Sequence, residues 1–566
     1  MLSPRALLRT KTELKGYRLL IKRLLQTSSC VHNIQRSSIE NIELPQGNLI
    51  ATVFRNIQQW PNKTAVECSV TGERYSYMEL WDASSRFGYA LKGLGIGKGD
   101  IVAIISPNCP EYPIALYGAF MIGAAVTMVN ATYMPGECAR QLENSGASVI
   151  ICHNSLDSIV DEALRMNQTH VPLITIGRSS LLHGVRNLID IITDPTIAHA
   201  EIEPLSGTEV AVLPYSSGTT GPPKLASLTH NAITSNLTMF THPAYYQYPE
   251  TTNDHQLSIM CHLPFSDAYG LGPLNAYSLH KGHRLVTVPQ FDPNTFVQTI
   301  QRYKIGVLHV VPPLIKFLAK SPLCDKDSFI SVDRMVCGGA TVSSSIVMSL
   351  KEKIDKDFFF QEGYGTTESL VTHMSPFGST KLGTAGQPLP NVQAKVVDML
   401  EGETQPQGVT GEILIKSPSV MLGYHKDLKA TRDSLDVYGW IHTGDVGYYD
   451  EDGYLIIKDR TQDYIKVNTF HVAPSELEDL LHQHPLVEDV GVVGVPDEMA
   501  GQVPRAYIVT KDQPDKEMAV RDICNYVESQ VSKHKQLAGG IVFIDELPRS
   551  KTGNLLRREL KKLCEK

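Results

Sequence analysis

The sequence lacks an excess of positive charge, paired cysteines and a long hydrophobic run. Its 566 residues carry 52 Lys and Arg against 60 Asp and Glu, a formal net charge of -8. A chain without basic character is not expected to bind nucleic acid. The 10 cysteines lie far apart with no C-x-x-C pair, which excludes a disulfide framework and a cysteine zinc site and indicates reduced thiols.

No segment is long and apolar enough to predict a transmembrane helix. The longest nearly uncharged run, Pro113 to Val129, is shorter than the ~20 residues that cross a bilayer, and Gly118 and Gly123 interrupt it. We expect a buried helix starting near Ile114 that turns at Gly123 into a strand over 124–129.

The N-terminal segment, residues 1–36, differs from the rest of the chain. Its basic residues are Arg5, Arg9, Lys11, Lys15, Arg18, Lys22, Arg23 and Arg36. Glu13 is its one acidic residue, and leucines and isoleucines fall between the basic residues at roughly helical spacing. Such a segment predicts a mitochondrial transit peptide and a mitochondrial location. The alternative is a solvated basic tail or a helix lying on a membrane surface.

The remaining chain has an ordinary globular composition, with 42% hydrophobic residues, and is long enough for several domains. Short β-branched runs such as 101–105, 149–151, 308–311 and 413–415 alternate with helical patterns, which predicts an α/β fold with largely parallel sheets. The pattern changes near 459–462. We therefore expect one domain over 37–459 and a second over 460–566, the latter with helices at 474–482 and 518–534 and strands at 490–495, 506–509 and 541–544.

The most informative segment runs from Tyr215 to Lys224 and reads Y-S-S-G-T-T-G-P-P-K. Glycines let backbone N–H groups approach an anion, hydroxyls donate hydrogen bonds, and the lysine adds a charge. The segment predicts a phosphate-binding loop that is not a Walker A loop. A flexible surface loop is the alternative. The candidate phosphate ligands are Ser216, Ser217, Gly218, Thr219, Thr220, Gly221 and Lys224.

Further motifs follow in a fixed order: C-G-G-A at 337–340, E-G-Y-G-T-T-E at 362–368, G-W-I-H-T-G-D at 439–445 and K-D-R at 458–460. With the loop, they make the chain from about Asn48 onward resemble the adenylate-forming superfamily of acyl-CoA synthetases, 4-coumarate:CoA ligases, luciferases and peptide adenylation domains. The resemblance implies an α/β fold. It implies a large N-terminal domain of layered α/β subdomains with a small β-barrel-like part, and a small α+β C-terminal domain on a hinge near Gln462.

The resemblance also implies roles for individual residues. Tyr364 stacks near the adenine, Thr367 bonds the α-phosphate, Asp445 and Arg460 hold the ribose, and Lys466 is catalytic. Glu368, with Thr220, holds Mg²⁺, since a lone carboxylate beside phosphates would be repelled without a bridging cation. The other implied nucleotide contacts are Gly338, Gly339, Ala340, Glu362, Gly363, Gly365, Thr366, Ile457 and Asn554. The implied substrate contacts are Asp267, Tyr269 and Thr341.

The implied activity is that of an ATP-dependent carboxylic acid:CoA ligase using ATP, Mg²⁺ and coenzyme A. A fatty or aromatic acid would form an acyl-adenylate and then an acyl-CoA thioester. The alternative is an adenylation-impaired nucleotide- or acyl-adenylate-binding homologue. It rests on Asn554, which replaces a family lysine, on Asn468 and Thr469 in the segment after the hinge, and on Asp267. A luciferase-like oxygenase is disfavoured because nothing specific to oxidation is visible.

Asp267 stands where relatives often carry His or an aromatic residue. Facing the substrate, its carboxylate would repel the acid unless it is protonated or paired. Alternatively, it points away and caps the following helix. The sequence leaves both interpretations open, and it predicts no oligomeric state.

Overall fold

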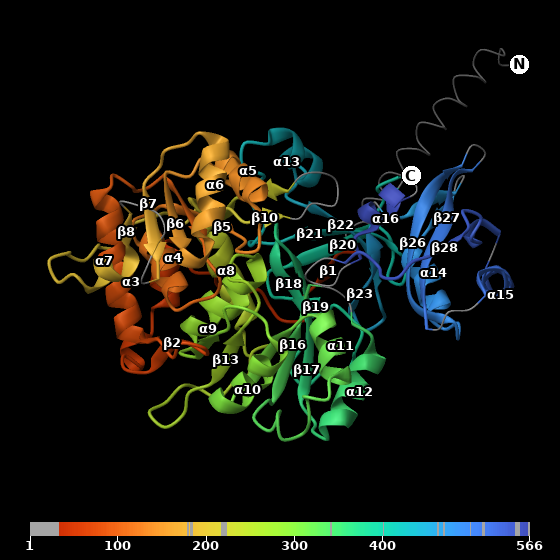
Figure 1. The fold of residues 1–566 in the computed structure, drawn as a ribbon, viewed down its shortest axis with the longest axis horizontal. Helices are drawn as coiled ribbons and strands as arrows, with labels where there is room; N and C mark the ends of the chain where they lie inside the picture. The colour runs from red at the N-terminus through yellow and green to blue at the C-terminus, as the bar shows by residue number, and fades with distance from the viewer. Residues whose placement is uncertain are drawn as a thin grey trace, which may run out of the picture.

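The computed structural model describes residues 33–177, 180, 185–216, 223–339, 342–399, 401–460, 463–467, 470–497, 500–511, 515–531, 533–549 and 555–563. Within them the chain forms four sheets and a two-stranded ribbon, with helices packed between and around the sheets (Figure 1). The α/β fold predicted from the sequence is confirmed.

The first sheet has seven strands in the order β12-β9-β5-β4-β6-β7-β8, parallel except for β12. Its strands are β4 (Ile101–Ile105), β5 (Ala125–Val129), β6 (Val149–His153), β7 (Leu173–Ile176), β8 (Arg186–Asn187), β9 (Val210–Val212) and β12 (Leu228–Thr229). In β4, Val102 and Ile104 join the core with α3 (Tyr77–Gly93) and α4 (Glu111–Met121). Alternate residues of β4 pack against α5 (Pro135–Ser145) and α6 (Asp157–Asn167). Since both faces are covered, the strand is apolar at every position.

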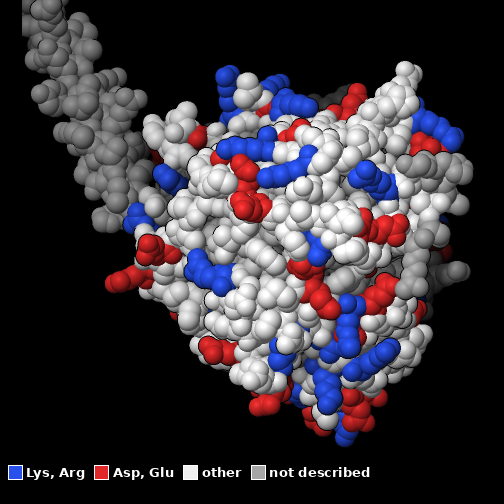
Figure 2. Space-filling model, turned by 90° about the vertical axis from the view of Figure 1, so that its left-hand side faces the viewer, with Lys and Arg blue, Asp and Glu red and all other residues white. Residues whose placement is uncertain are grey.

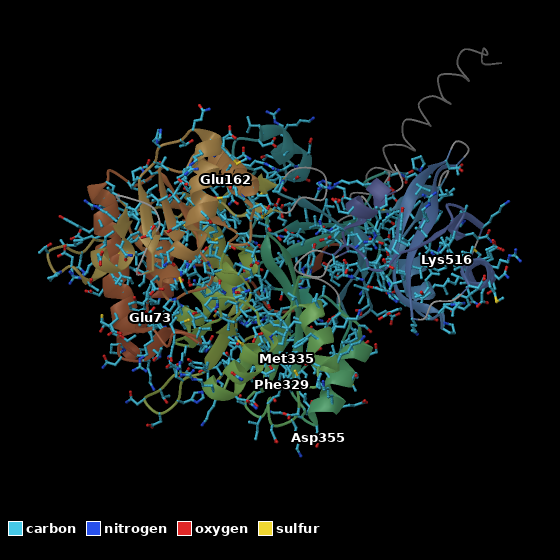
Figure 3. All side chains as sticks on the ribbon, viewed as in Figure 1. Glu73, Glu162, Phe329, Met335, Asp355 and Lys516 are labelled. Atoms are coloured by element: carbon cyan, nitrogen blue, oxygen red, sulfur yellow. The ribbon has the colours of Figure 1, made fainter. Side chains whose placement is uncertain are left out.

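The second sheet has nine strands in the order β19-β18-β17-β16-β15-β13-β14-β2-β3. They are β2 (Thr64–Cys68), β3 (Arg74–Ser76), β13 (Ser258–Cys261), β14 (Arg284–Thr287), β15 (Val307–Val310), β16 (Arg334–Cys337), β17 (Phe359–Thr366), β18 (Leu370–Met374) and β19 (Gln387–Pro388). One face packs on α10 (Pro293–Tyr303), α11 (Pro312–Lys320) and α12 (Ser344–Ile354). Figure 3 marks Met335 and Phe329 in this layer and Asp355 at the end of α12.

The other face of the second sheet shares one core with the first sheet. The helices of that core include α2 (Leu49–Val53), α3, α4, α8 (His230–Phe240) and α9 (Tyr277–His280). The large domain is therefore layered helix, sheet, helix, sheet, helix. Its surface mixes charges of both signs on the face seen in Figure 2.

The third sheet is antiparallel, in the order β1-β20-β21-β22-β23. Its strands are β1 (Gln35–Arg36), β20 (Gln393–Val397), β21 (Gly411–Lys416), β22 (Ile441–Tyr449) and β23 (Leu455–Arg460). It corresponds to the expected barrel-like part, although its edge strands do not pair with each other in the residues described. β1 pairs with β20, so the last residues of the predicted targeting segment belong to the folded domain.

The C-terminal domain has its own core and follows β23 (Figure 1). Its elements are β24 (Ile465–Val467), β25 (Phe470–Val472), α14 (Pro474–Leu481), β26 (Val487–Asp497), β27 (Gly501–Thr510), α15 (Lys516–Gln530), β28 (Ile541–Phe543) and α16 (Arg557–Leu563). The second helix was expected to reach residue 534, and this was wrong. Val531 adopts extended backbone angles, φ -130° and ψ 157°, which end the helix.

The predicted helix and strand around Gly123 are confirmed as α4 and β5. No described helix is long and apolar enough to cross a membrane. The cysteines of the described chain are free, and most are buried. The remaining elements are β10 (Tyr215–Ser216), β11 (Lys224–Leu225), α7 (Leu188–Thr193), α13 (Leu428–Ser434), the π-helix Gly270–Ala276 and the 3₁₀ turns Ile57–Gln59, Asn154–Leu156 and Lys533–Lys535.

Candidate active site

Several predicted motifs meet because they follow neighbouring parallel strands of the second sheet. Strand β15 pairs with β16, and β16 pairs with β17 so that Cys337 lies opposite Glu362. Gly338 therefore leaves the sheet beside the segment 363–366. The segment containing Asp267 follows β13, which pairs with β15. The carboxyl ends of parallel strands are where α/β sheets bind ligands, and this edge is the candidate site.

The predicted ribose pair is formed in the structure. The Nε atom of Arg460 lies 2.8 Å from Oδ1 of Asp445, and the hydroxyl of Tyr364 donates to Oδ2 at 2.6 Å. Asp445 is 5% exposed. Burial raises its pKa, and the Arg460 guanidinium opposes that shift. The three side chains come from β17, β22 and β23, which orient one carboxylate between an aromatic hydroxyl and a cation.

The glycine at 365 is required by the backbone around it. A Cβ there would lie 2.0 Å from the carbonyl oxygen of Leu370, because β17 and β18 shift register between Tyr364 and Gly365. No side chain fits such a gap. The glycine thus allows the turn at 367–369 that carries Thr367 and Glu368.

The two ends of the predicted phosphate loop pair as β10 and β11, with Ser216 opposite Lys224. Residues 217–221 and Thr220 among them lie outside the described chain, so their predicted roles rest on the sequence. The amine of Lys224 lies 5.1 Å above the ring of Tyr424. The described ends therefore hold the loop's lysine at the site.

Tyr424 is a site residue that sequence reasoning missed. Its hydroxyl donates to Oε1 of Glu368 at 2.8 Å while its ring lies under Lys224. Burial and then the Glu368 charge raise the pKa of Tyr424. The sequence signal that could have found it is the preceding glycine, Gly423. Its φ is 148°, a conformation that favours glycine. Tyr424 thus joins the predicted phosphate loop to the E-G-Y-G-T-T-E segment.

Glu368 lies close enough to the ribose pair to act on its charges. Burial lowers the pKa of Arg460, but Asp445, Tyr364 and Glu368 together raise it above its ordinary value. Glu368 also adds to the rise in the pKa of Asp445. The described chain holds no cluster of three or more His, Cys, Asp or Glu that could bind a metal alone. Glu368 is a half-buried single carboxylate. Such a group suits Mg²⁺, because this ion usually takes its other ligands from phosphates and water.

The predicted acid pocket contains Tyr269 packed against Gly338. A Cβ on Gly338 would lie 3.1 Å from the ring of Tyr269, so the glycine gives the ring its space. The Tyr269 hydroxyl hydrogen-bonds Nδ1 of His309 at 2.9 Å and donates to the Val336 carbonyl at 3.3 Å. Burial lowers the pKa of His309 to about 3, so the imidazole is neutral. These partners fix the ring, and Thr341 and Ala340 lie outside the described residues.

For Asp267 the structure shows the capping role that the sequence left open, and a role at the substrate stays a prediction. Its Oδ1 accepts a hydrogen bond from the Gly270 N–H at 2.8 Å, so it caps the following helix. The side chain remains accessible to solvent, yet the surrounding protein desolvates the carboxyl and raises its pKa to about 6. An accessible but desolvated carboxyl fits a residue that borders a recess in the protein.

Other predicted residues have structural partners at the same edge. Glu362 is 5% exposed and accepts the Gly383 N–H at 2.8 Å, and burial raises its pKa to about 7. Thr366 bonds the hydroxyl of Ser369 at 3.1 Å. Gly363 lies within β17 opposite Met374 of β18, and Gly339 follows the end of β16. These residues shape the strand ends at which the nucleotide contacts are predicted.

The predicted residues beyond β23 are only partly described. Ile457 lies on β23 opposite Gly447, and Lys466 lies on β24 opposite His471. The carboxylate of Asp459 accepts the Ser475 N–H at 3.0 Å, tying the domain boundary to α14. Gln462, Asn468, Thr469 and Asn554 lie outside the described residues.

Comparison with known proteins matches both parts of the chain to one enzyme family. The model of the AMP-binding enzyme family matches residues 53–425, and that of the AMP-binding enzyme C-terminal domain matches residues 476–554. "Probable 4-coumarate--CoA ligase 1" of Dictyostelium discoideum is 33% identical, covering 93% of this chain and 97% of its own. "4-coumarate--CoA ligase" of Pinus taeda is 32% identical, covering 94% and 98%.

Among solved structures, ATP-bound MatB from Rhodopseudomonas palustris matches with a TM-score of 0.81 and 25% identity, covering 91% of this chain and 98% of its own. The likeness spans the large and the C-terminal domain. The chain belongs to the AMP-binding enzymes of the adenylate-forming superfamily.

Proposed function

We propose that this enzyme activates an aromatic or fatty carboxylic acid with ATP and transfers the acyl group to coenzyme A. Its family and its relatives make it an ATP-dependent acid:CoA ligase. The proposal adds the class of acid, Mg²⁺ as the metal and the mitochondrion as the compartment. The observation that carries it is the convergence of Lys224, Tyr424, Glu368 and Asp445 on one edge of the second sheet.

In the first step a carboxylate oxygen of the acid attacks the α-phosphorus of ATP. A C–O–P linkage forms, the bond to the pyrophosphate breaks, and pyrophosphate leaves. Lys224 and the N–H groups of the phosphate loop would neutralise the phosphates, while Asp445 and Arg460 hold the ribose. Such catalysis depends on positioning and charge stabilisation, because the protein forms no covalent bond.

In the second step the thiolate of coenzyme A attacks the acyl carbon of the adenylate. The thioester forms and AMP leaves with the electrons of the broken acyl–oxygen bond. In the superfamily the C-terminal domain rotates between the two steps, which would bring the segment after the hinge to the acyl group. Here the tie between Asp459 and Ser475 marks the start of that moving part.

Mg²⁺ fits the residues present and would be held by Glu368 together with the phosphates of ATP. When bound, it supplies positive charge that offsets the phosphate oxygens. Tyr424 orients the Glu368 carboxylate by donating to one of its oxygens at 2.8 Å. That hydrogen bond leaves the rest of the carboxylate available to the ion.

An aromatic acid is favoured by the acid pocket. The Tyr269 ring is fixed by His309 and packs where Gly338 leaves space, and a flat aromatic ring can stack on or against it. Relatives at 33% and 32% identity are named for 4-coumarate, an aromatic acid. A fatty acid remains in the proposal because none of these contacts sets the length of the acid.

The test is ATP–pyrophosphate exchange by the full chain with Mg²⁺ and a panel of aromatic and fatty acids, followed by CoA-dependent AMP release. Exchange and AMP release with an aromatic acid support the proposal. Exchange without AMP release contradicts thioester formation and implicates Asn468 and Thr469 in its loss. No exchange with any acid contradicts the ligase and favours the impaired homologue.

Asn554 decides between full and impaired adenylation. The relatives reported above are named as ligases, and none supports the impaired homologue. Restoring a cation by Asn554→Lys is expected to raise the rate of adenylate formation, since one preorganised donor is worth ~10²–10³ in rate. Robust exchange by the parent and no change in Asn554→Lys would show that the lysine position is not limiting.

We propose a mitochondrial location on the basis of residues 1–36, which are basic, poor in acid and amphipathic. N-terminal sequencing of the protein isolated from mitochondria should find a start after Met1, near the beginning of β1. A protein absent from mitochondria, or one that retains Met1 there, contradicts the location or its processing.

A further inference from the structure

The loop between β4 and α4 reaches the second sheet through one buried side chain, Asn108, which is 4% exposed. Its amide nitrogen donates to the carbonyls of Cys261 at 2.9 Å and Leu263 at 2.7 Å, and its Oδ1 accepts the N–H of Phe265 at 2.8 Å. These partners lie at least 153 residues further along the chain. Asn108 thus spends its donors and its acceptor on the backbone of one distant segment.

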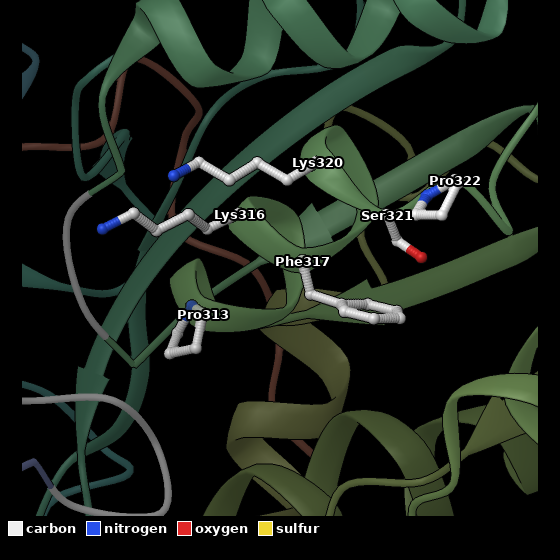
Figure 4. A pocket seen from close by; sticks show the side chains of 6 residues that line it. All are labelled: Pro313, Lys316, Phe317, Lys320, Ser321 and Pro322. Atoms are coloured by element: carbon white, nitrogen blue, oxygen red, sulfur yellow. The ribbon is translucent and has the colours of Figure 1, made fainter.

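The segment that Asn108 holds lies in neither a helix nor a strand. Strand β13 ends at Cys261, and residues 262–267 follow without regular structure. Pro264 offers no N–H to a neighbour. The segment after the adjacent β15 differs, because α11 begins at Pro312 and its own hydrogen bonds fix that backbone (Figure 4). Since buried backbone groups need partners, the segment after β13 depends on the hydrogen bonds from Asn108.

A shift of this segment would pass to the residues of the predicted acid pocket. A Cβ on Gly270 would lie 1.8 Å from the Pro264 carbonyl oxygen, so the start of the π-helix rests directly on the segment. The Asp267 carboxylate in turn accepts the Gly270 N–H at 2.8 Å. Tyr269 lies between Asp267 and Gly270 in the chain. The position of Pro264 therefore sets where both side chains start.

Helix α4 supports the same segment by packing. Phe265 is buried, and its ring centroid lies 5.5 Å from that of Tyr112 in the first turn of α4. Burial raises the pKa of Tyr112, and the charge of Asp267 adds to that rise, so the two side chains are close. The loop after β4 and the start of α4 thus form the wall behind Asp267.

We propose that Asn108 is a positioning residue for the acid substrate. It fixes residues 261–265, and through them it orients Asp267 and Tyr269 toward the carboxylic acid without touching the acid itself. The first sheet thereby contributes to adenylation through a loop that carries none of the predicted motifs. The inference rests on the proposed function, because it names a residue that acts through the acid site of that function.

The test compares the full chain with Asn108→Ala in ATP–pyrophosphate exchange, using an acid that the parent activates. We expect kcat/KM for the acid to fall by up to about 100-fold, since a misplacement of about 1 Å can cost that much. The KM for ATP should change far less, because the ribose pair is built on other strands. An unchanged kcat/KM for the acid would overturn the proposal.

Asn48→Ala is the matched control. Asn48 is 7% exposed and also bridges three backbone groups: it donates to the carbonyls of Phe120 at 2.9 Å and Glu203 at 3.3 Å and accepts the Ile50 N–H at 3.2 Å. The control should lower the melting temperature as Asn108→Ala does, because each leaves buried carbonyls unpaired. It should keep the parent kcat/KM for the acid. Equal losses of kcat/KM in both variants would overturn a positioning role.

Asn108→Asp is the conservative variant, and it also decides if Asn108→Ala fails to fold. A neutral carboxyl has one O–H donor and one carbonyl acceptor, whereas a carboxylate has no donor for the two carbonyls. Burial beside carbonyls raises the pKa of such a carboxyl. Activity relative to the parent should therefore recover as pH falls from about 8 to about 6. Activity as low as that of Asn108→Ala at every pH would contradict the role of these hydrogen bonds.

Amide hydrogen exchange of residues 262–271 tests the placement without any activity. Exchange of this segment should be faster in Asn108→Ala, because the Phe265 N–H loses its acceptor, and should match the parent in Asn48→Ala. If the parent activates no acid, the proposed function fails, and hydrogen exchange still decides the role of Asn108. Equal hydrogen exchange in parent and Asn108→Ala would then overturn the inference, and faster exchange confined to this segment would support it.

Discussion

At the residue scale, Tyr424 shows how one side chain can serve two motifs. Its ring lies under Lys224 and its hydroxyl donates to Glu368. Neither partner is near it in sequence. The phenol can therefore hold both the loop's cation and the candidate metal ligand in one orientation.

Tyr424→Phe keeps the ring but removes the hydrogen bond to Glu368. A hydrogen bond to a charged group is worth about 1.5–3 kcal/mol, so adenylate formation should fall roughly 10- to 100-fold, with a higher Mg²⁺ requirement. Pyrophosphate exchange at graded Mg²⁺ measures this. Tyr438→Phe, at an exposed tyrosine, is the control. An unchanged Mg²⁺ dependence would mean that Tyr424 does not orient Glu368.

The raised pKa of Asp267 predicts that binding of the acid substrate depends on pH. Desolvation raises its pKa to about 6 from an ordinary value of 3.8, so the carboxyl is neutral below about pH 6 and charged above it. A charged Asp267 repels a substrate carboxylate. The kcat/KM for the acid should therefore fall as pH rises through about 6.

In Asp267→Asn this fall should disappear, because the amide keeps the shape and carries no charge. The difference in thermal stability between variant and parent should shift in favour of the variant from pH 4.5 to pH 7. The folded pKa is raised, so the native state binds more protons than the unfolded state between about pH 4 and pH 6, and the parent loses stability as pH rises through that window. Identical pH profiles for parent and variant would contradict a role for Asp267 at the acid.

At the element scale, the strands of the second sheet decide where the motifs lie. The C-G-G-A and E-G-Y-G-T-T-E segments are separated by a helix in sequence and lie side by side because β16 and β17 pair in parallel. The register shift within β17 then produces the turn that carries Glu368. A single glycine permits this shift.

Gly365→Ala is expected to disturb β17 and β18, since its Cβ would lie 2.0 Å from the Leu370 carbonyl oxygen. Overpacking of this kind costs about 1–3 kcal/mol or more, and the variant should unfold at lower temperature and lose exchange activity. Circular dichroism melting measures the first effect. Gly97→Ala, where a Cβ meets nothing within 4 Å, is the control. Equal melting of both variants would refute the steric argument.

At the scale of the whole molecule, a partly buried arginine connects segments of the C-terminal domain. The Arg557 guanidinium lies 2.6 Å from Glu478 on α14 and 3.6 Å from Asp463 after the hinge, and its side chain is 14% exposed. Burial raises the pKa of Glu478 to about 7, opposed by Arg557. The contact fastens α16 to α14.

Arg557→Met should destabilise this domain by about 3–5 kcal/mol at pH 8, because it removes the cation beside the desolvated Glu478 carboxylate. The loss should shrink as pH falls from 8 to 6, because without Arg557 the pKa of Glu478 lies above its parent value of about 7 and the carboxyl takes up a proton. Thermal unfolding at pH 6 and pH 8 measures both effects. Lys562→Met, which breaks an exposed pair with Glu559 on the same helix, should cost at most about 1 kcal/mol. A pH-independent loss would contradict the role of Glu478.

The sequence by itself determined the family, the α/β class and the positions of a few strands and helices. Its motifs are local, and their order is specific even where each is weak. The alternation of β-branched and helical segments is equally local, so β4, α4 and β5 could be predicted from residues near one another. Charge and cysteine spacing also exclude classes of function without any fold.

Only the tertiary structure decided which motifs meet and what holds them. Tyr424, His309 and Arg557 act across long separations in sequence, and no local pattern marks such partners. It also decided that Asp267 caps a helix and that the surrounding protein desolvates its carboxyl, because both depend on the atoms around it. Strand pairing and burial are properties of the assembled chain, and they set the distances and charges from which the chemistry follows.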